Sequence, residues 1–180
     1  FGNVMNKPNY KNTGSFRDYY LVNSFDQLDV TVDVYGWYKA KNGYDYYGRK
    51  NGDGRTRELG REAVDAAEAA GVDFSKYDND GDGKVDVLML VHSGIGAEAG
   101  SQNQYIWSHR GALGQQARTY DGVNINDYMV QPELSGGLIS NIGVFVHEFG
   151  HALGLPDLYD VDYSSEAVGN WAVMAGGCYN

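Results

Sequence analysis

The chain has 180 residues, of which 42% are hydrophobic, and carries a formal net charge of -10 at pH 7. A chain of this length usually forms one domain, and this hydrophobic share is ample for a buried core. The negative charge argues against nucleic acid or an anionic membrane surface as a partner, since both would repel it. No apolar run approaches the length of a membrane span, so we expect one domain over residues 1–180 that does not insert into a membrane.

The N-terminal third is expected to hold a helix, a strand and a loop. Capping and apolar positions over residues 15–24 predict the helix. Residues 28–38 alternate between apolar and polar side chains, which predicts a half-buried strand. The Gly- and Tyr-rich residues 39–54 are expected to form a loop whose tyrosines anchor at the surface. Within this loop, residues 51–54 are a weak calcium candidate that is more simply a turn.

A long helix and an apolar strand follow. Residues 55–70 repeat small and apolar side chains at helical spacing, and Gly71 can end such a helix. We expect this helix to lie against one face of a sheet. Residues 85–91 are almost wholly apolar, which predicts a central strand covered on both sides.

Short strands are expected before a second helix. They span residues 104–109 and 117–131, the latter stretch divided by the two-residue hairpin signal Asp121-Gly122. Residues 138–153 predict a helix whose apolar side should pack against the sheet through side chains four residues apart: Phe145, Phe149 and Leu153. Together the elements predict an α/β (α+β) fold with a twisted mixed sheet and backing helices.

Two histidines and a glutamate lie on one side of this second helix. His147 and His151 are four residues apart, about 40° from each other around the helix axis, so both imidazoles can reach one ion. Glu148 lies about 100° round from His147, close enough to hold a water on that ion without being a ligand. Burying such a face is costly unless something pairs with it. The pattern predicts one catalytic zinc ion with Glu148 as the general base.

The residues after the helix predict the third zinc ligand. Gly154 can take the left-handed position at a helix C-terminus and Pro156 cannot continue a helix, so the chain should turn sharply beneath the metal. This turn would bring in Asp157 and leave the fourth tetrahedral position for water, as a catalytic zinc site requires. Glu166 is the alternative third ligand, as in peptidases that take a glutamate from a later helix. The helix-breaking residues favour Asp157.

A second metal-binding pattern occupies residues 78–86. It has alternating carboxylates, a glycine for a sharp turn, a carbonyl and a ninth-place carboxylate in the order of a calcium loop: Asp78, Asp80, Asp82, Gly83, Lys84 and Asp86. The twelfth place holds Met89 instead of a bidentate glutamate, and a strand is expected where an EF-hand would have its second helix. We expect structural calcium in a loop without the EF-hand; a solvated acidic turn is the alternative.

A longer stretch around the zinc motif is recognisable. Residues 147–157, followed by 158–160 and 169–177, resemble the immune inhibitor A family of secreted bacterial metallopeptidases within the metzincin clan. In metzincins a methionine-containing turn lies under the zinc, and Met174 matches it. Some metzincins carry a further ligand, a tyrosine, two residues later, where this chain has Gly176. Other segments agree with the family: residues 44–48, 78–86, 91–94 and 106–109.

The resemblance implies a metzincin-like zincin. Residues 1–154 would form an N-terminal subdomain with the sheet and the active-site helix, and residues 155–180 the start of a small C-terminal subdomain with the Met-turn. Family domains usually begin with a strand and continue past the Met-turn into a helix, so the chain is expected to be part of a longer precursor. The resemblance also implies a secreted, extracellular enzyme that acts on protein or peptide substrates, with an export signal and a propeptide removed during maturation.

The mechanism that these residues predict is metal-assisted hydrolysis of a peptide bond. Zinc held by His147, His151 and Asp157 would lower the pKa of a bound water towards about 7 and polarise the scissile carbonyl. Glu148 would take the proton of that water and pass it to the leaving nitrogen. Residues 127–133 resemble the metzincin edge strand, so bound peptide should pair there as an added strand.

Two other functions stay open. A calcium-stabilised secreted binding module with structural zinc is one, although such a site has no use for Glu148 beside its ligands. A latent or inactive peptidase fragment is the other. Cys178 is the only cysteine, which excludes an internal disulfide and fits a small residue near the Met-turn. The sequence does not assign roles to three further residues, of which the histidines are most simply structural: Glu98, His92 and His109.

Overall fold

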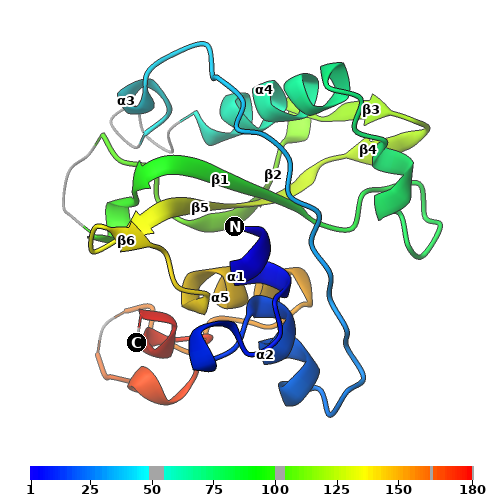
Figure 1. Cartoon of the computed structure of the whole chain (residues 1–180). Helices are drawn as coiled ribbons and strands as arrows, with labels where there is room; N and C mark the ends of the chain where they lie inside the picture. The colour runs from blue at the N-terminus through cyan, green and yellow to red at the C-terminus, as the bar shows by residue number, and fades with distance from the viewer. Residues whose placement is uncertain (49–54, 100–103, 163, 180) are drawn as a thin grey trace. The chain divides into compact units, whose positions relative to one another are not determined.

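A computed structural model of the chain describes residues 1–48, 55–99, 104–162 and 164–179 (Figure 1). The α-helices are α1 (Gly2–Asn6), α2 (Phe16–Asn23), α3 (Tyr44–Tyr47), α4 (Thr56–Ala69) and α5 (Gly143–Ala152). The strands are β1 (Leu88–Ile95), β2 (His109–Ala112), β3 (Arg118–Tyr120), β4 (Val123–Ile125), β5 (Asp127–Ser135) and β6 (Leu138–Ile139). Short 3-10 helices connect several of these elements. The weak calcium candidate at residues 51–54 lies outside the described residues.

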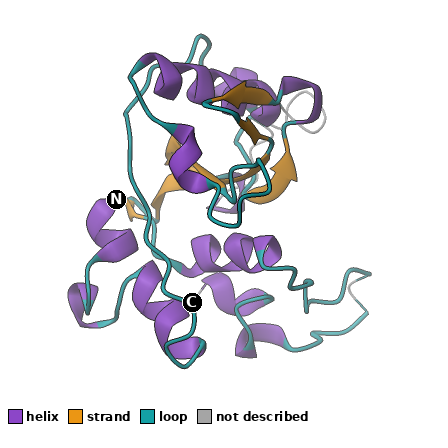
Figure 2. Cartoon of the chain, turned by 90° about the vertical axis from the view of Figure 1, so that its right-hand side faces the viewer, coloured by secondary structure: helices purple, strands orange, loops and turns teal. Residues whose placement is uncertain are grey.

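The chain forms two compact units. Unit 1 consists of Phe1–Tyr35 and Asn141–Asn180, and unit 2 of Gly36–Ser140. The described strands all belong to unit 2, whereas the described part of unit 1 consists of helices and loops (Figure 2). The boundaries between the units lie after Tyr35 and after Ser140, whereas the expected subdomain boundary lies after residue 154. Residues 1–35 and 141–180 belong to the same unit.

The main sheet of unit 2 is mixed, as expected. Its strand order is β1-β5-β2, with β1 parallel to β5, β2 antiparallel to it, and β6 antiparallel to its end. Two expectations are wrong here. The apolar strand β1 lies at the end of this order and starts only at Leu88, while Val85 packs into a separate cluster beside the β3–β4 hairpin. The expected edge strand β5 is the inner strand, with Tyr128 opposite both Leu88 and Gly111.

Helix α4 covers one face of this sheet, as its spacing predicts (Figure 1). Leu59 and Ala63 pack against a core cluster that the strands share. Helix and sheet approach closely at Gly60, where an added Cβ would lie 3.1 Å from the side chain of Leu90 in β1. The helix ends before Gly71, which has the left-handed φ of +84°. The predicted hairpin is also confirmed, since Asp121 and Gly122 connect β3 and β4 with φ of +51° and +84°.

The stretch expected to be a tyrosine-bearing surface loop contains α3, and part of it is core. Tyr47 is fully buried, and its hydroxyl donates to Glu62 Oε2 over 2.8 Å. The Tyr44 hydroxyl donates to the Ile95 carbonyl and accepts from the backbone of Ile106. These tyrosines therefore connect α3 with α4 and β1. The prediction that they anchor at the surface is wrong, because their hydroxyl groups find hydrogen-bond partners inside unit 2.

Residues 28–38 form no strand, although half-buried and exposed residues alternate over residues 28–33. The side-chain amide of Asn6 takes the place of a neighbouring strand. Its Nδ2 donates to the Val32 carbonyl over 2.7 Å, and its Oδ1 accepts from the Val32 amide over 2.9 Å. The predicted strand is therefore wrong, because a side chain and not a neighbouring strand pairs with the backbone of Val32.

Unit 1 holds the helix of the zinc motif. Helix α2 confirms the first expected helix, with a capping box between Ser15 and Asp18. Helix α5 begins at Gly143, five residues later than expected, because residues 138–139 pair with β5 as β6 instead. The apolar side of α5 packs on α2: the ring of Phe149 lies 5.3 Å from Phe16 and 4.9 Å from Tyr20. The third residue expected on this side, Leu153, is 46% exposed.

Candidate metal centre

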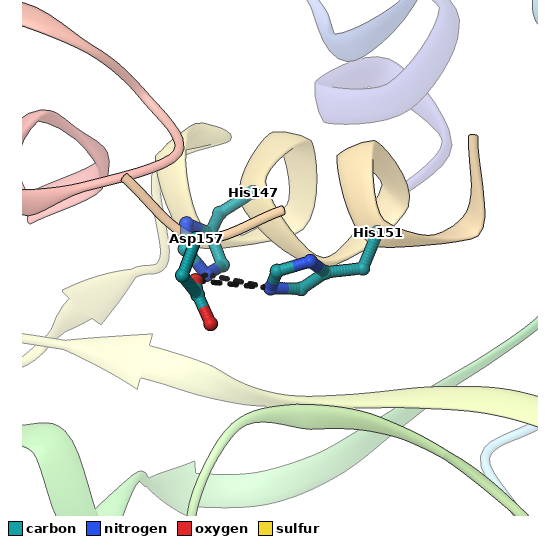
Figure 3. A group of neighbouring side chains, drawn as sticks. All are labelled: His147, His151 and Asp157. Carbon is teal, nitrogen blue, oxygen red and sulfur yellow. Dashed lines mark hydrogen bonds and ion pairs between the residues drawn. The ribbon is translucent and has the colours of Figure 1, made fainter. Parts of the chain in front are cut away.

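Three side chains converge beside helix α5. His147 and His151 extend from the helix, and Asp157 comes from the loop after it (Figure 3). The two histidine Nε2 atoms are 3.2 Å apart, and each is 3.2 Å from Asp157 Oδ1. Four tetrahedral ligands at zinc distances of about 2.0–2.1 Å lie about 3.3–3.4 Å from one another. The triangle of donor atoms therefore has the size that a tetrahedral zinc ion requires.

The outer nitrogens of both imidazoles are fixed by backbone carbonyls. His147 Nδ1 lies 2.9 Å from the Val173 carbonyl, and His151 Nδ1 lies 2.9 Å from the Leu155 carbonyl. Because a carbonyl only accepts, each Nδ1 carries the proton, and in the neutral imidazole each Nε2 presents a lone pair. Asp157 Oδ1 is buried and has no hydrogen-bond donor among the described residues. Three electron-pair donors thus face one another, an arrangement that a bound cation stabilises.

The turn that brings Asp157 to the histidines has the predicted cause. Gly154 has φ of +89°, and the amide of Leu155 donates to the Gly150 carbonyl over 3.0 Å. The amide of Gly154 donates to the His151 carbonyl over 3.0 Å. These two bonds form the Schellman motif that ends many helices. Since the motif depends on local backbone geometry, the position of Asp157 follows from the residues next to the helix.

Met174 lies against the same helix. It is buried, and a Cβ added at Gly150 would lie 2.5 Å from Met174 Sδ, so a larger residue between the two histidines would displace the Met174 side chain. The Met174 carbonyl accepts from the amide of Leu158 over 2.8 Å. The preceding carbonyl, that of Val173, is the one bound to His147. Residues 173–174 therefore connect the helix, one histidine and the segment that carries Asp157.

The other residues expected around the metal lie as follows. Glu148 is buried in α5. Glu166 is exposed, and in the part of the chain that the structure describes it belongs to no group of side chains close enough to share a metal. Asp157 therefore fits the third position better than Glu166. Cys178 is buried, and its carbonyl approaches Gly143 so closely that a Cβ there would lie 2.1 Å from it.

Sequence reasoning missed Tyr159. Its hydroxyl donates to Asp157 Oδ2 over 2.9 Å, on the carboxylate oxygen that does not face the histidines. The signal in the sequence is a tyrosine two residues after a predicted ligand.

The acidic loop in unit 2 brings together part of its predicted set. Carboxylate oxygens of Asp78, Asp80 and Asp82 lie within 4.8 Å of one another. Asp86 is outside this group and accepts from Asn79 Nδ2 over 2.5 Å. The Lys84 ammonium lies 2.5 Å from Asp82, and this hydrogen bond holds the pKa of Asp82 below its ordinary value. Asp78 Oδ1 is buried without a hydrogen-bond partner in the described part of the chain.

The three residues left open by the sequence have structural contacts in unit 2. Glu98 accepts hydrogen bonds from the Ser108 hydroxyl over 2.5 Å and from the Ser108 amide over 3.4 Å. His92 is buried beside Tyr44, and burial lowers the pKa of its imidazole. His109 Nε2 lies 2.9 Å from the Tyr128 hydroxyl. His92 is thus part of the unit 2 interior, whereas His109 is half-buried.

Comparison with known proteins agrees with the geometry of the site. The profile of the immune inhibitor A peptidase M6 catalytic domain matches residues 1–180. The pre-pro-metalloprotease PrtV of Vibrio cholerae is 34% identical over 207 aligned residues, which cover 96% of this chain and 22% of PrtV. Immune inhibitor A of Bacillus thuringiensis is 32% identical over 205 residues, which cover 92% of this chain and 28% of that protein.

The chain thus spans about a quarter of the length of these relatives. Within the described residues, the helices are too short or too polar to cross a membrane. The match over the full chain, together with the His147, His151 and Asp157 triangle, shows that the chain belongs to the immune inhibitor A family of M6 metallopeptidases.

Proposed function

We propose that this chain is the catalytic part of a secreted zinc endopeptidase that hydrolyses peptide bonds of protein substrates. The observation that carries the proposal is the triangle of three lone-pair donors, 3.2 Å on each side. Two imidazoles and one carboxylate are a donor set that zinc accepts, and they leave one tetrahedral position open. Membership of a metallopeptidase family supports peptide-bond hydrolysis as the reaction. The sequence resemblance to a family of secreted bacterial peptidases supports an extracellular location.

The chain's own residues would act in two ways. His147, His151 and Asp157 hold the ion, and the carbonyls of Val173 and Leu155 keep the imidazole rings in orientation. When bound, zinc supplies Lewis acidity that lowers the pKa of a water and polarises the scissile carbonyl. Glu148 takes up the proton released when water attacks and delivers it to the leaving nitrogen.

Three details support this assignment of residues. Glu148 is buried in the helix between the two ligand histidines, where a structural site would have no use for it. Gly150 gives Met174 room beneath the helix, which is the place of a Met-turn. The fixed Nδ1 protons leave only the Nε2 atoms for the metal. All three details come from unit 1 alone.

Glu148→Gln tests the function. Because the amide cannot accept a proton but keeps the size of the side chain, this variant should retain one zinc per chain. It should lose about two to four orders of magnitude in turnover of a protein substrate, the usual contribution of a general base. The matched control is Glu166→Gln, an exposed glutamate of the same unit, which should keep full turnover. A zinc-loaded Glu148→Gln variant that cleaves at the parental rate would disprove the role of Glu148.

Calcium binding by the acidic loop is a separate part of the proposal. Three carboxylates lie close together, and Asp78 Oδ1 is buried without a donor. A hard cation with oxygen ligands would satisfy this atom and offset the mutual repulsion of the carboxylates. Lys84 offsets part of that repulsion at Asp82. We therefore assign calcium a structural role, with Asp78, Asp80 and Asp82 as the ligands.

A further inference from the structure

The two oxygens of the Asp157 carboxylate have different surroundings. Oδ1 is buried, faces the two Nε2 atoms and has no hydrogen-bond donor among the described residues. Oδ2 accepts a hydrogen bond from the Tyr159 hydroxyl over 2.9 Å. A carboxylate that turns about its Cβ–Cγ bond can offer a metal one oxygen or both. The hydrogen bond to Oδ2 favours the orientation of the carboxylate in which Oδ1 faces the two Nε2 atoms.

Among the described residues, each proposed ligand side chain has a hydrogen bond through the atom that does not face the metal position; we call this second group its outer partner. The two histidines are oriented by backbone carbonyls, which no substitution removes. Asp157 is oriented by a side chain, and this makes its outer contact accessible to mutation. Partners of this kind set the direction and basicity of a ligand, and their loss typically weakens metal binding about 10–100-fold.

The backbone on both sides of Tyr159 is held in place. On one side the amide of Leu158 donates to the Met174 carbonyl over 2.8 Å. On the other side Asp160 Oδ2 accepts from the Ser165 amide over 2.7 Å and from the Ser164 hydroxyl over 2.8 Å. The Leu158 bond thus anchors the main chain next to Tyr159, and the Asp160 side chain anchors the loop that follows. Because the Tyr159 side chain is 44% exposed, packing alone does not account for a tyrosine here.

We propose that Tyr159 is a positioning residue of the metal centre, which holds Asp157 Oδ2 so that the carboxylate binds zinc through Oδ1 alone. The proposal rests on the zinc site of the proposed function. It assigns Tyr159 no contact with the substrate or with the reacting atoms.

The test is Tyr159→Phe, which removes one oxygen and keeps the ring. The zinc affinity of the protein, measured by competition with a chromophoric chelator, should fall about 10–100-fold. With cobalt(II) in place of zinc, the visible absorption spectrum should change, since the carboxylate is free to rotate. Tyr179→Phe is the matched control, a tyrosine of the same unit that is 59% exposed, and it should leave both readouts unchanged.

Two further measurements separate positioning from other roles. In an Asp157→Ala background, Tyr159→Phe should no longer change zinc affinity, because the group on which it acts is gone. The melting temperature without metal should equal that of the parent. Parental zinc affinity in Tyr159→Phe would overturn the proposal, and so would a turnover loss without an affinity loss or a lower metal-free melting temperature. A parent protein that binds no zinc would instead refute the proposed function itself.

Discussion

The two candidate metal sites of this protein differ in how their donor atoms are held. In unit 1, backbone carbonyls, a Schellman turn and a buried helix hold the donors of His147, His151 and Asp157 at 3.2 Å from one another. In unit 2, Asp80 accepts from the backbone amide of Asp82, and Asp82 accepts from Lys84. The donor atoms of the first site have the separation that a tetrahedral zinc ion requires. The carboxylates of the second site instead accept hydrogen bonds from other residues of the same loop.

This difference predicts how each site responds to its ion. A preorganised site loses little conformational freedom on binding, so its affinity depends on the identity of each ligand. A loop that must exchange its own hydrogen bonds for a cation gains order when the cation binds, and its contribution appears as stability of the folded chain. The experiments below test these expectations, beginning with the largest expected effect.

Replacing the third ligand should have the largest effect. Asp157→Ala removes one of three protein ligands and should weaken zinc binding by more than about 100-fold, beyond the range typical of outer partners. Glu166→Ala should leave zinc affinity within twofold of the parent, since this exposed residue is outside the donor group. Metal analysis that ranks the two variants in the opposite order would move the third ligand to Glu166.

The acidic loop should affect stability instead of zinc affinity. At a calcium concentration about a hundredfold above Kd, the parent should gain about 2.7 kcal/mol, or about 5–10 °C in melting temperature. The double variant Asp80→Ala with Asp82→Ala should show no gain, and both proteins should be measured with zinc saturating. Equal calcium responses in the two proteins would make the loop a solvated acidic turn.

A smaller effect is expected at the contact between α5 and Met174. Gly150→Ala would place Cβ 2.5 Å from Met174 Sδ, and the overpacking should cost about 1–3 kcal/mol of unfolding free energy. Zinc affinity should fall as well, because the Val173 carbonyl that orients His147 is next to Met174. The control is Gly2→Ala in α1, where nothing lies within 4 Å of the added Cβ. Equal stability of the two variants would argue against the close contact.

The metal centre could be predicted because its geometry is local. His147 and His151 share a helix face by their spacing, and the Gly154 turn that brings in Asp157 depends on hydrogen bonds within residues 150–155. The same holds for helix α4 and for the hairpin at Asp121-Gly122, where the signals lie within the element itself.

The errors concern contacts between residues far apart in sequence. The alternation over residues 28–38 could not show that the Asn6 amide would replace a strand partner. The apolar run that ends in β1 could not show that Val85 serves a second cluster and that β5 takes the inner position of the sheet. Tyr44 and Tyr47 looked like surface residues because their hydroxyl partners lie elsewhere in the fold. Periodicity determines which side of an element is apolar, and not what covers that side.

X-ray absorption at the zinc edge of the metal-loaded protein tests the central claim most directly. The account predicts one zinc per chain with four nitrogen or oxygen ligands at about 2.0–2.1 Å, two of them showing the outer-shell scattering of imidazole. A sulfur ligand at about 2.3 Å, which would implicate Cys178, or a six-coordinate ion without two imidazoles would contradict it.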